Sequence, residues 1–158
     1  MTPINNITRF LDSRKIKYIA HELPHEKLGA LEAAQILSVP EAQVFKTIVT
    51  VREKGKPVLA VIPGDRSVDL KSLAAFLGEK KMSLPTQKEA ETLTGLQAGG
   101  ISPLALINKG FQTVIDSACE NFREIYISGG QRGINIQIGV DDLIKLSNAN
   151  AGAISKMP

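Results

Sequence analysis

One lysine in this chain stands in surroundings that indicate a binding pocket. Lys46 lies in QVFKTIVTV (residues 43–51), whose branched and aromatic residues predict a β-strand. Because side chains alternate along a strand, Lys46 shares a face with Val44 and Ile48. A lysine on a largely apolar face extends to solvent, pairs with a carboxylate, or points into a pocket that binds an anion or a carbonyl.

Three glycine-containing loops could supply backbone donors to the same chemistry. They are IPGDRS (62–67), GGISP (99–103) and SGGQRG (128–133). Glycine lets the main chain approach a ligand closely and leaves its N–H groups exposed. Each loop taken alone is more often an ordinary turn, and none fits a P-loop or a dinucleotide-binding fingerprint. Together with Lys46 they indicate phosphate or carbonyl binding and no more.

The other reactive side chains form no recognisable catalytic or metal-binding pattern. His21 and His25 are separated by Glu-Leu-Pro, which disfavours a shared helix face, so we predict no metal site and no cofactor. Cys119 has no histidine nearby in sequence. A small buried residue is therefore favoured over a nucleophile, although a fold could still bring His21 to it. Ser102 lacks the G-x-S-x-G elbow of serine hydrolases.

The composition limits the class of protein. The chain has 158 residues, enough for one domain, with 43% hydrophobic residues and a net charge of +3. Aromatic residues make up 4% and tryptophan is absent, which disfavours a nucleic-acid surface of stacked aromatics. A single cysteine excludes an intramolecular disulfide and fits a reducing compartment. No apolar run is long enough to cross a bilayer and no secretory signal pattern begins the chain, so we expect a cytoplasmic protein without a membrane partner.

Helices and strands are mixed without strict alternation. We expect a first helix capped by Thr2 with Pro3 at its first position, and later helices over 30–39, from Asp69 to Gly78, from a Thr86/Glu89 capping box to Gly95, and over 140–149 with its cap near Asp141. Strands are expected at 16–21, 43–51, 57–65, 80–84, 111–116, 124–130 and 134–139, and residues 152–158 form either an ordered edge or a tail. The expected fold is one α+β domain over 1–158, with a mixed, mostly antiparallel sheet or open barrel surrounded by helices.

The order of the motifs is more specific than any one of them. FKT (45–47), PGDRSVDLKSLA (63–74), TGLQAGGISP (94–103), TVIDSA (113–118), IYISGGQRG (125–133) and DDLIKL (141–146) follow one another along the chain. In this order they resemble the YbaK/EbsC family, freestanding relatives of the editing domain of bacterial prolyl-tRNA synthetases. The resemblance covers residues 14–148 and implies an open-barrel α+β fold whose loops surround one pocket.

The resemblance also implies a set of site residues. Lys46 corresponds to the family's pocket lysine, and Gly99, Gly100 and Ser102 belong to a G-x-x-x-P loop whose N–H groups would hold the scissile carbonyl and its oxyanion. The substrate-binding residues it implies are Thr47, Ile101, Pro103, Ser128, Gly129, Gly130 and Arg132.

The activity implied is removal of a wrong amino acid from tRNA. Cysteine on tRNA(Pro) is the first expectation, released as a thiolactone by attack of its own thiol on the ester, and alanine on tRNA(Pro) is the second. Prolyl-tRNA synthetase is a possible partner. One departure concerns the amino acid: related deacylases often carry a tyrosine where this chain has Leu23.

Two readings without catalysis stay open. The domain could be a binding module for a nucleotide or a tRNA end, or Lys46 could be a structural lysine paired with a carboxylate. For phosphate contacts with tRNA the candidates are Arg66, Lys71, Lys80, Lys81 and Arg132.

Overall fold

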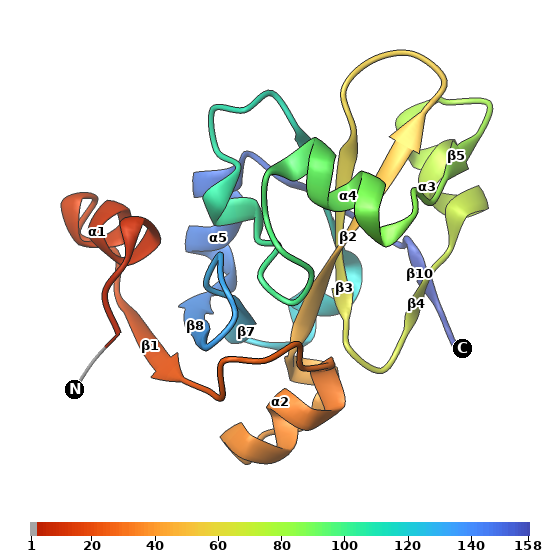
Figure 1. Ribbon diagram of the computed structural model, residues 1–158. Coiled ribbons are helices and arrows are strands. Elements are labelled where there is room, and N and C mark those ends of the chain that lie inside the picture. The colour runs from red at the N-terminus through yellow and green to blue at the C-terminus, as the bar shows by residue number, and fades with distance from the viewer. Residues whose placement is uncertain (1–2) are drawn as a thin grey trace.

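The computed structural model describes residues 3–158 and folds them into short helices around two main sheets (Figure 1). The α-helices are α1 (Asn6–Ser13), α2 (Ala30–Leu37), α3 (Leu70–Leu77), α4 (Gln87–Thr94) and α5 (Val140–Ser147). The strands are β1 (Tyr18–Glu22), β2 (Phe45–Arg52), β3 (Val58–Pro63), β4 (Ser67–Val68), β5 (Met82–Ser83), β6 (Gln112–Asp116), β7 (Glu124–Ser128), β8 (Ile134–Gly139), β9 (Asn150–Gly152) and β10 (Ser155–Lys156). Three-residue and five-residue 3₁₀ turns, η1 (Glu41–Gln43), η2 (Pro103–Ala105) and η3 (Ser117–Asn121), complete the chain.

The sheets are mixed and mostly antiparallel. The larger sheet has the order β5-β2-β3-β6-β9, and the smaller one has the order β1-β8-β7, with β10 and β4 forming a separate pair. Only the pairings of β6 with β3 and β9 are parallel among the named strands of the described chain. A bridge between Val44 and Tyr126 joins the two main sheets where β2 begins. The expected α+β class with an open, mostly antiparallel arrangement is confirmed.

Period-two alternation sends one face of the smaller sheet into the main core. In β8, Ile134, Ile136 and Ile138 are buried in this core, which α1 and α5 also cover. Asn135 and Gln137 therefore lie on the opposite face of β8. That opposite face looks toward α2, which packs on Leu23, Val44 and Tyr126 in a smaller apolar cluster. The sheet thus has an apolar face for stability and a polar face left for other uses.

Helix ends follow the expected signals where the signals are local. Thr86 and Glu89 form the predicted capping box of α4, with both hydrogen bonds at 3.1 Å. Asp69 caps α3 by accepting from the Ser72 N–H at 3.1 Å, as predicted. The predicted N-cap near Asp141 was wrong: Gly139 is the N-cap of α5, and Asp141 lies in the first turn of the helix.

The predicted start of α1 was also wrong, because a hydrogen bond to a distant loop sets where the helix begins. Thr2 lies outside the described residues, and Pro3 precedes the helix, whose cap is Asn5. Asn5 Oδ1 accepts from the Thr8 N–H at 2.9 Å, and Asn5 Nδ2 donates to the carbonyl of Gly129 at 2.8 Å. The second bond fixes the helix start through a residue more than a hundred positions away, which no local pattern reveals.

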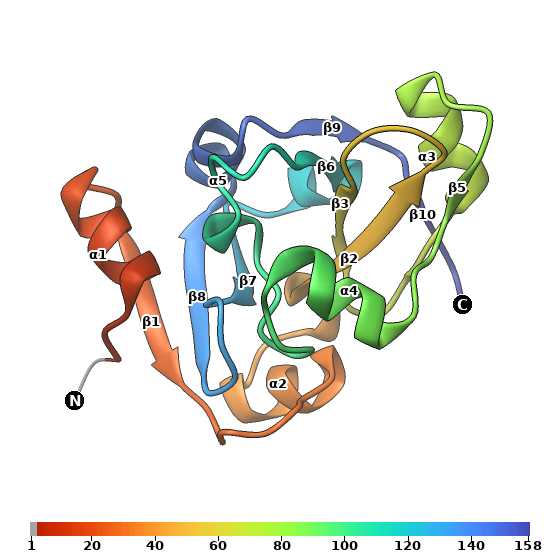
Figure 2. The ribbon, with the colours of Figure 1, turned by 45° about the horizontal axis from the view of Figure 1, so that its top comes forward.

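The C-terminal residues form an ordered edge. β9 pairs with β6 and β10 pairs with β4, beside α3 at one end of the molecule (Figures 1 and 2). Asp116 holds this segment: its carboxylate accepts from the Ile154 N–H at 3.0 Å and from the Ala118 N–H at 3.1 Å. Over residues 3–158, no helix has the length and apolar character needed to cross a bilayer.

Replacing Asp116 with alanine should lower the free energy of unfolding by about 3 kcal/mol, because two backbone N–H groups lose a charged acceptor in a buried place. Urea unfolding of Asp116→Ala measures this. The matched control is Asp65→Ala, which removes an exposed carboxylate and should change stability by less than about 0.5 kcal/mol. Equal stability of the two variants would show that Asp116 does not hold the C-terminal segment.

Candidate active site

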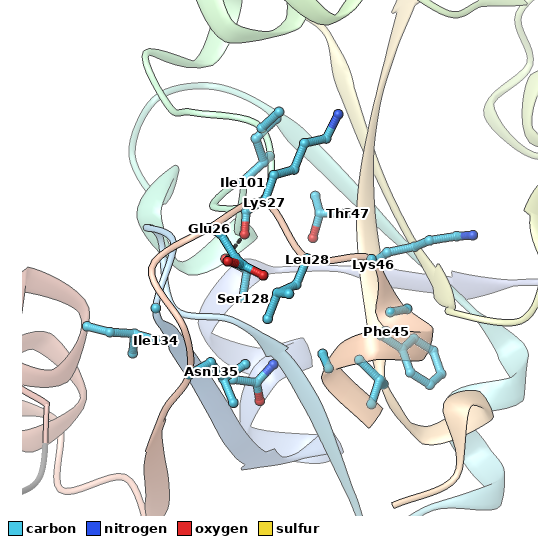
Figure 3. Close-up of a pocket in the computed structure, with 18 of the residues that line it drawn as sticks. Glu26, Lys27, Leu28, Phe45, Lys46, Thr47, Ile101, Ser128, Ile134 and Asn135 are labelled. Atoms are coloured by element: carbon cyan, nitrogen blue, oxygen red, sulfur yellow. Dashed lines mark hydrogen bonds between the residues drawn. The ribbon is translucent and has the colours of Figure 1, made fainter. Parts of the chain in front are cut away.

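A cavity of about 350 Å³ opens where the two sheets meet, large enough for a small ligand (Figure 3). Four segments distant in sequence form it: the start of β2, the loop into α2, the loop after α4, and the β7–β8 turn region. Its lining residues are Leu23, Glu26, Lys27, Leu28, Gly29, Ala30, Ala33, Val44, Phe45, Lys46, Thr47, Ile48, Ala98, Gly99, Ile101, Ser128, Gly133, Ile134 and Asn135.

Two glycine loops pack directly on one another at this cavity. The Ser128 hydroxyl donates to the carbonyl of Gly99 at 3.4 Å, the dashed line in Figure 3, and Arg132 Nε donates to the carbonyl of Ala98 at 2.8 Å. A Cβ on Gly100 would lie 2.7 Å from Cα of Gln131, closer than real contacts allow. Gly100 is therefore required because the two main chains touch.

The loop after α4 is a tight turn with a fixed pattern of backbone donors. The Gly100 N–H donates to the carbonyl of Gln97 at 2.8 Å, and Gly99 in the turn has φ +90°. The carboxylate of Glu91, on α4, accepts from the Ala98 N–H at 2.7 Å. Within residues 3–158, the N–H groups of Gly99 and Ile101 have no hydrogen-bond acceptor. Both residues line the cavity, so these two donors are available to a ligand.

Lys46 lies at the edge of the cavity without a carboxylate partner among residues 3–158. It is half-buried, and its ammonium donates to the carbonyl of Gly64 at 3.2 Å, in the IPGDRS loop. In Figure 3 the side chain extends away from Ser128 and Asn135. An ammonium has three donors, so two remain for a ligand. The arrangement does not match a structural lysine in a closed ion pair.

The structure brings together some of the predicted site residues and separates others. Lys46, Thr47, Gly99, Ile101 and Ser128 line the cavity. Gly100, Ser102, Pro103, Gly129, Gly130 and Arg132 do not.

The separated residues have identifiable structural roles. Ser102 is fully buried and its hydroxyl accepts from the Leu104 N–H at 3.2 Å, which caps η2, and Pro103 is buried behind it. Gly129 and Gly130 face a second hollow beside α1. Of the loop residues whose N–H groups were expected to hold the carbonyl, Gly100 is therefore engaged in the turn and Ser102 lies in the interior, which leaves Gly99 and the neighbouring Ile101.

Several cavity residues were missed by sequence reasoning. Glu26, Lys27 and Leu28 belong to a loop that looked merely polar; Lys27 Nζ donates to Gln87 Oε1 at 2.6 Å and so links this loop to α4. Asn135 was missed inside an ordinary strand. A possible signal was its type, because asparagine is uncommon in strands. Leu23, the departure from related sequences, is buried in the cavity wall.

The remaining candidate nucleophiles and ligands are occupied elsewhere. His21 Nε2 hydrogen-bonds Gln137 Oε1 at 2.9 Å, and in residues 3–158 no group of three His, Cys, Asp or Glu side chains could hold a metal. Cys119 is fully buried and lies beside Glu120 and Asp141 rather than at the cavity. Burial, reinforced by the carboxylates of Glu120 and Asp116, raises the pKa of the Cys119 thiol to about 11.

The predicted phosphate contacts divide in the same way. Arg66 donates to the Ser155 hydroxyl at 2.7 Å and to its carbonyl at 3.1 Å, so it holds the C-terminal segment, as Arg132 holds the glycine loop. Lys71, Lys80 and Lys81 are exposed around α3.

The fold and site define a small α+β domain with a cavity at which two packed glycine loops and a lysine meet. Solved structures share this fold: one described as hypothetical protein APE2540 matches with a TM-score of 0.88 at 23% identity over 96% of this chain and all of that one. Another, of a proposed trans-editing enzyme for prolyl-tRNA synthetase, matches with a TM-score of 0.78 at 24% identity over 98% of this chain and 99% of that one. At these identities the likeness shows the fold.

Sequence comparison supplies the family. The model of the aminoacyl-tRNA editing domain matches residues 25–146, and the chain belongs to this family. It is 34% identical to the proposed Cys-tRNA(Pro)/Cys-tRNA(Cys) deacylase EbsC of Enterococcus faecalis, over 95% of this chain and 92% of that protein. It is 30% identical to the multifunctional Ser/Thr-tRNA deacylase ProXp-y of Escherichia coli, over 78% of this chain and 76% of that one. A proline–tRNA ligase of Thermodesulfovibrio yellowstonii matches at 30% over 68% of this chain, which spans 18% of the ligase. The resemblance inferred from the motif order is confirmed.

The raised pKa of Cys119 predicts slow alkylation of the folded protein. At pH 8 only about one thiol in a thousand is ionised when its pKa is about 11, so iodoacetamide should label native Cys119 at least about 100-fold more slowly than the urea-unfolded chain. The rate should rise as pH increases toward 11. Fast labelling of the native protein at pH 8 would show that the thiol is accessible and ionised, and would reopen its assignment as a buried structural residue.

Proposed function

We propose that this protein is a freestanding aminoacyl-tRNA deacylase that removes a mischarged amino acid from tRNA(Pro), with cysteine as its first substrate. The observation that carries the proposal is the pair of free N–H groups of Gly99 and Ile101 at a cavity that also holds Lys46. Fixed donors of this kind stabilise the negative charge that develops on an ester carbonyl oxygen. The names of the relatives, two of them deacylases, support the same class of reaction.

The reaction needs no protein nucleophile. In the proposed step the thiol sulfur of a cysteinyl ester bonds to its own carbonyl carbon, the bond from that carbon to the ribose oxygen breaks, and the thiol proton passes to that oxygen. The products are a cysteine thiolactone and free tRNA. The protein contributes by holding the ester so that its thiol and carbonyl meet, which is a large effect for intramolecular reactions. The Ser128 hydroxyl, engaged with Gly99 and the Gly130 N–H, is not a free nucleophile.

Lys46 in this proposal binds the tRNA end. Its ammonium is anchored on the Gly64 carbonyl at the edge of the cavity, with two donors unused. This position suits the ribose–phosphate of the terminal nucleotide better than the ester carbonyl, which the loop donors would hold. The exposed Lys71, Lys80 and Lys81 would add phosphate contacts that weaken with salt, and prolyl-tRNA synthetase would supply the choice of tRNA. We place the activity in the cytoplasm, where mischarged tRNA arises.

Lys46→Ala should lower kcat/KM for deacylation of Cys-tRNA(Pro) by about 100-fold or more, because the substrate end loses its cationic contact. The free energy of unfolding should change by less than about 1 kcal/mol, since the lysine makes a single hydrogen bond. The assay compares Cys-tRNA(Pro) and Ala-tRNA(Pro) side by side.

The control for this variant is Lys54→Ala, which removes an exposed lysine at the other end of the same hairpin and should leave deacylation unchanged. Full activity of Lys46→Ala would refute the assigned role. Binding of mischarged tRNA by the wild type without release of any amino acid would instead identify a non-catalytic module.

Gly100→Ala should reduce deacylation of Cys-tRNA(Pro) by about tenfold or more, because the added methyl group forces the two glycine loops apart and displaces the donors. Gly139→Ala is the matched control: its new Cβ would meet nothing closer than 3.5 Å, at a φ of −63° that alanine adopts freely. If both variants kept wild-type rates, the contact between the loops would not matter for activity.

A further inference from the structure

The polar face of β8 carries one side chain whose hydrogen-bonding groups are unused. Asn135 is 5% exposed and lines the cavity, and its Oδ1 is buried without a donor among residues 3–158. Of the two polar atoms of this amide, it is Oδ1 that is both buried and unpaired in the described part of the chain. A buried amide left without partners costs free energy, so such a group calls for a ligand or an ordered water.

A neighbour of the same chemical type on this face does have hydrogen-bond partners. Gln137, two positions along the same face of β8, uses both ends of its amide: Oε1 bonds His21 at 2.9 Å and Nε2 donates to Glu124 at 3.2 Å. Gln137 does not line the cavity. The amide of Gln137, outside the cavity, is therefore fully hydrogen-bonded, whereas the amide oxygen of Asn135, at the cavity, has no partner.

The position of Asn135 sets it near the reacting ester. Asn135 is the cross-strand partner of Ser128, so their side chains share a face about 5 Å apart. The Ser128 hydroxyl in turn bonds the carbonyl of Gly99, whose N–H is one of the free donors. Figure 3 shows Asn135 below Leu28 and Ser128. A group on the β carbon of an ester held at Gly99 would lie within reach of this amide.

The side chains around the Asn135 amide determine which kind of substrate group it can bind. Leu23, Ala33 and Val44, which pack together in one apolar cluster, also line the cavity and are all buried. A cation is disfavoured there, because burying an ammonium beside apolar groups without a counter-charge is costly. The carboxylate of Glu26, exposed at the opening, is better placed for the α-ammonium of the amino acid. The buried amide suits a neutral group that can both donate and accept.

We propose that Asn135 is the residue that selects amino acids carrying a thiol or hydroxyl on the β carbon, by hydrogen-bonding that group; this rests on the deacylase function proposed above. Serine esters are then substrates together with cysteine esters, but by hydrolysis: a water molecule bonds to the ester carbonyl carbon, the bond from that carbon to the ribose oxygen breaks, and a proton of the water passes to that oxygen. Alanine esters react by the same hydrolytic step. Alanine fits the volume but leaves the buried amide unsatisfied, and is therefore the poorer substrate.

The test compares the wild type with Asn135→Ala and Asn135→Leu, the second of which keeps the side-chain volume and avoids a cavity. Deacylation of cysteinyl-, seryl- and alanyl-tRNA(Pro) is measured for each. Cysteinyl and seryl rates should fall about tenfold or more in both variants, while alanyl rates change by less than about twofold. Gln137→Ala, checked for folding by its thermal midpoint, is the control and should preserve the wild-type ratio of seryl to alanyl rates.

Equal losses on all three substrates, or no loss on any, would overturn the assignment of Asn135. A second measurement separates this from failure of the deacylase proposal: binding of the stable amide analogues 3′-serylamino- and 3′-alanylamino-3′-deoxyadenosine to the wild type and Asn135→Leu. If the wild type releases no amino acid but binds the seryl analogue more tightly, and Asn135→Leu removes this preference, the proposed deacylase function is wrong and the proposed role of Asn135 is supported. If it shows no preference, the selectivity fails whatever the turnover.

Discussion

The site depends on one close contact between two main chains. Gly100 lies against the backbone of Gln131 with no space for a side chain, and this contact joins the loop after α4 to the β7–β8 turn. The hydrogen bonds from Arg132 to Ala98 and from Ser128 to Gly99 hold the pair in register. Each bond contributes on the order of 1 kcal/mol, but their geometry fixes where the free N–H groups lie. The positions of the two free backbone donors at the cavity follow from this contact.

Three conventional nucleophiles are engaged elsewhere in the structure. Cys119 is buried with a raised pKa, His21 is bonded to Gln137, and Ser128 is used to join the loops. The cavity offers the two backbone donors, one anchored ammonium and the unpaired amide oxygen of Asn135, and Thr47 also lines it. Such a site can orient an ester and stabilise its oxyanion, and an aminoacyl ester is reactive enough to need little more.

Most elements could be predicted because their signals are local. The β2–β3 hairpin, the Thr86/Glu89 capping box and the alternation of isoleucines in β8 depend on residues a few positions apart. The start of α1 could not, because the bond from Asn5 to Gly129 selects it. The ordered conformation of the C-terminal segment likewise depends on hydrogen bonds to Asp116 and Arg66, which are distant in sequence.

For the candidate site too, features with a local signal could be predicted and features set by distant contacts could not. The motifs located the two glycine loops and Lys46, since glycine and a lysine on an apolar strand are unusual in their own right. They could not tell which glycine N–H is free, because that depends on the turn that engages Gly100. Nor could they separate Asn135 from Gln137, two amides on one face of one strand. Only the positions of His21 and Glu124 show that one amide is satisfied and the other is not.

In the proposed selection of the amino acid, the polarity of the cavity lining would matter more than its size. Among the lining residues, Glu26 and Lys27 are exposed and charged, Gly99 and Ile101 carry free N–H groups, and Asn135 is buried with a neutral amide. A size limit alone would accept alanine wherever it accepts cysteine or serine, since alanine is smaller. If Asn135 selects the substrate as proposed, a smaller amino acid that cannot bond to this buried amide gains nothing from fitting the cavity.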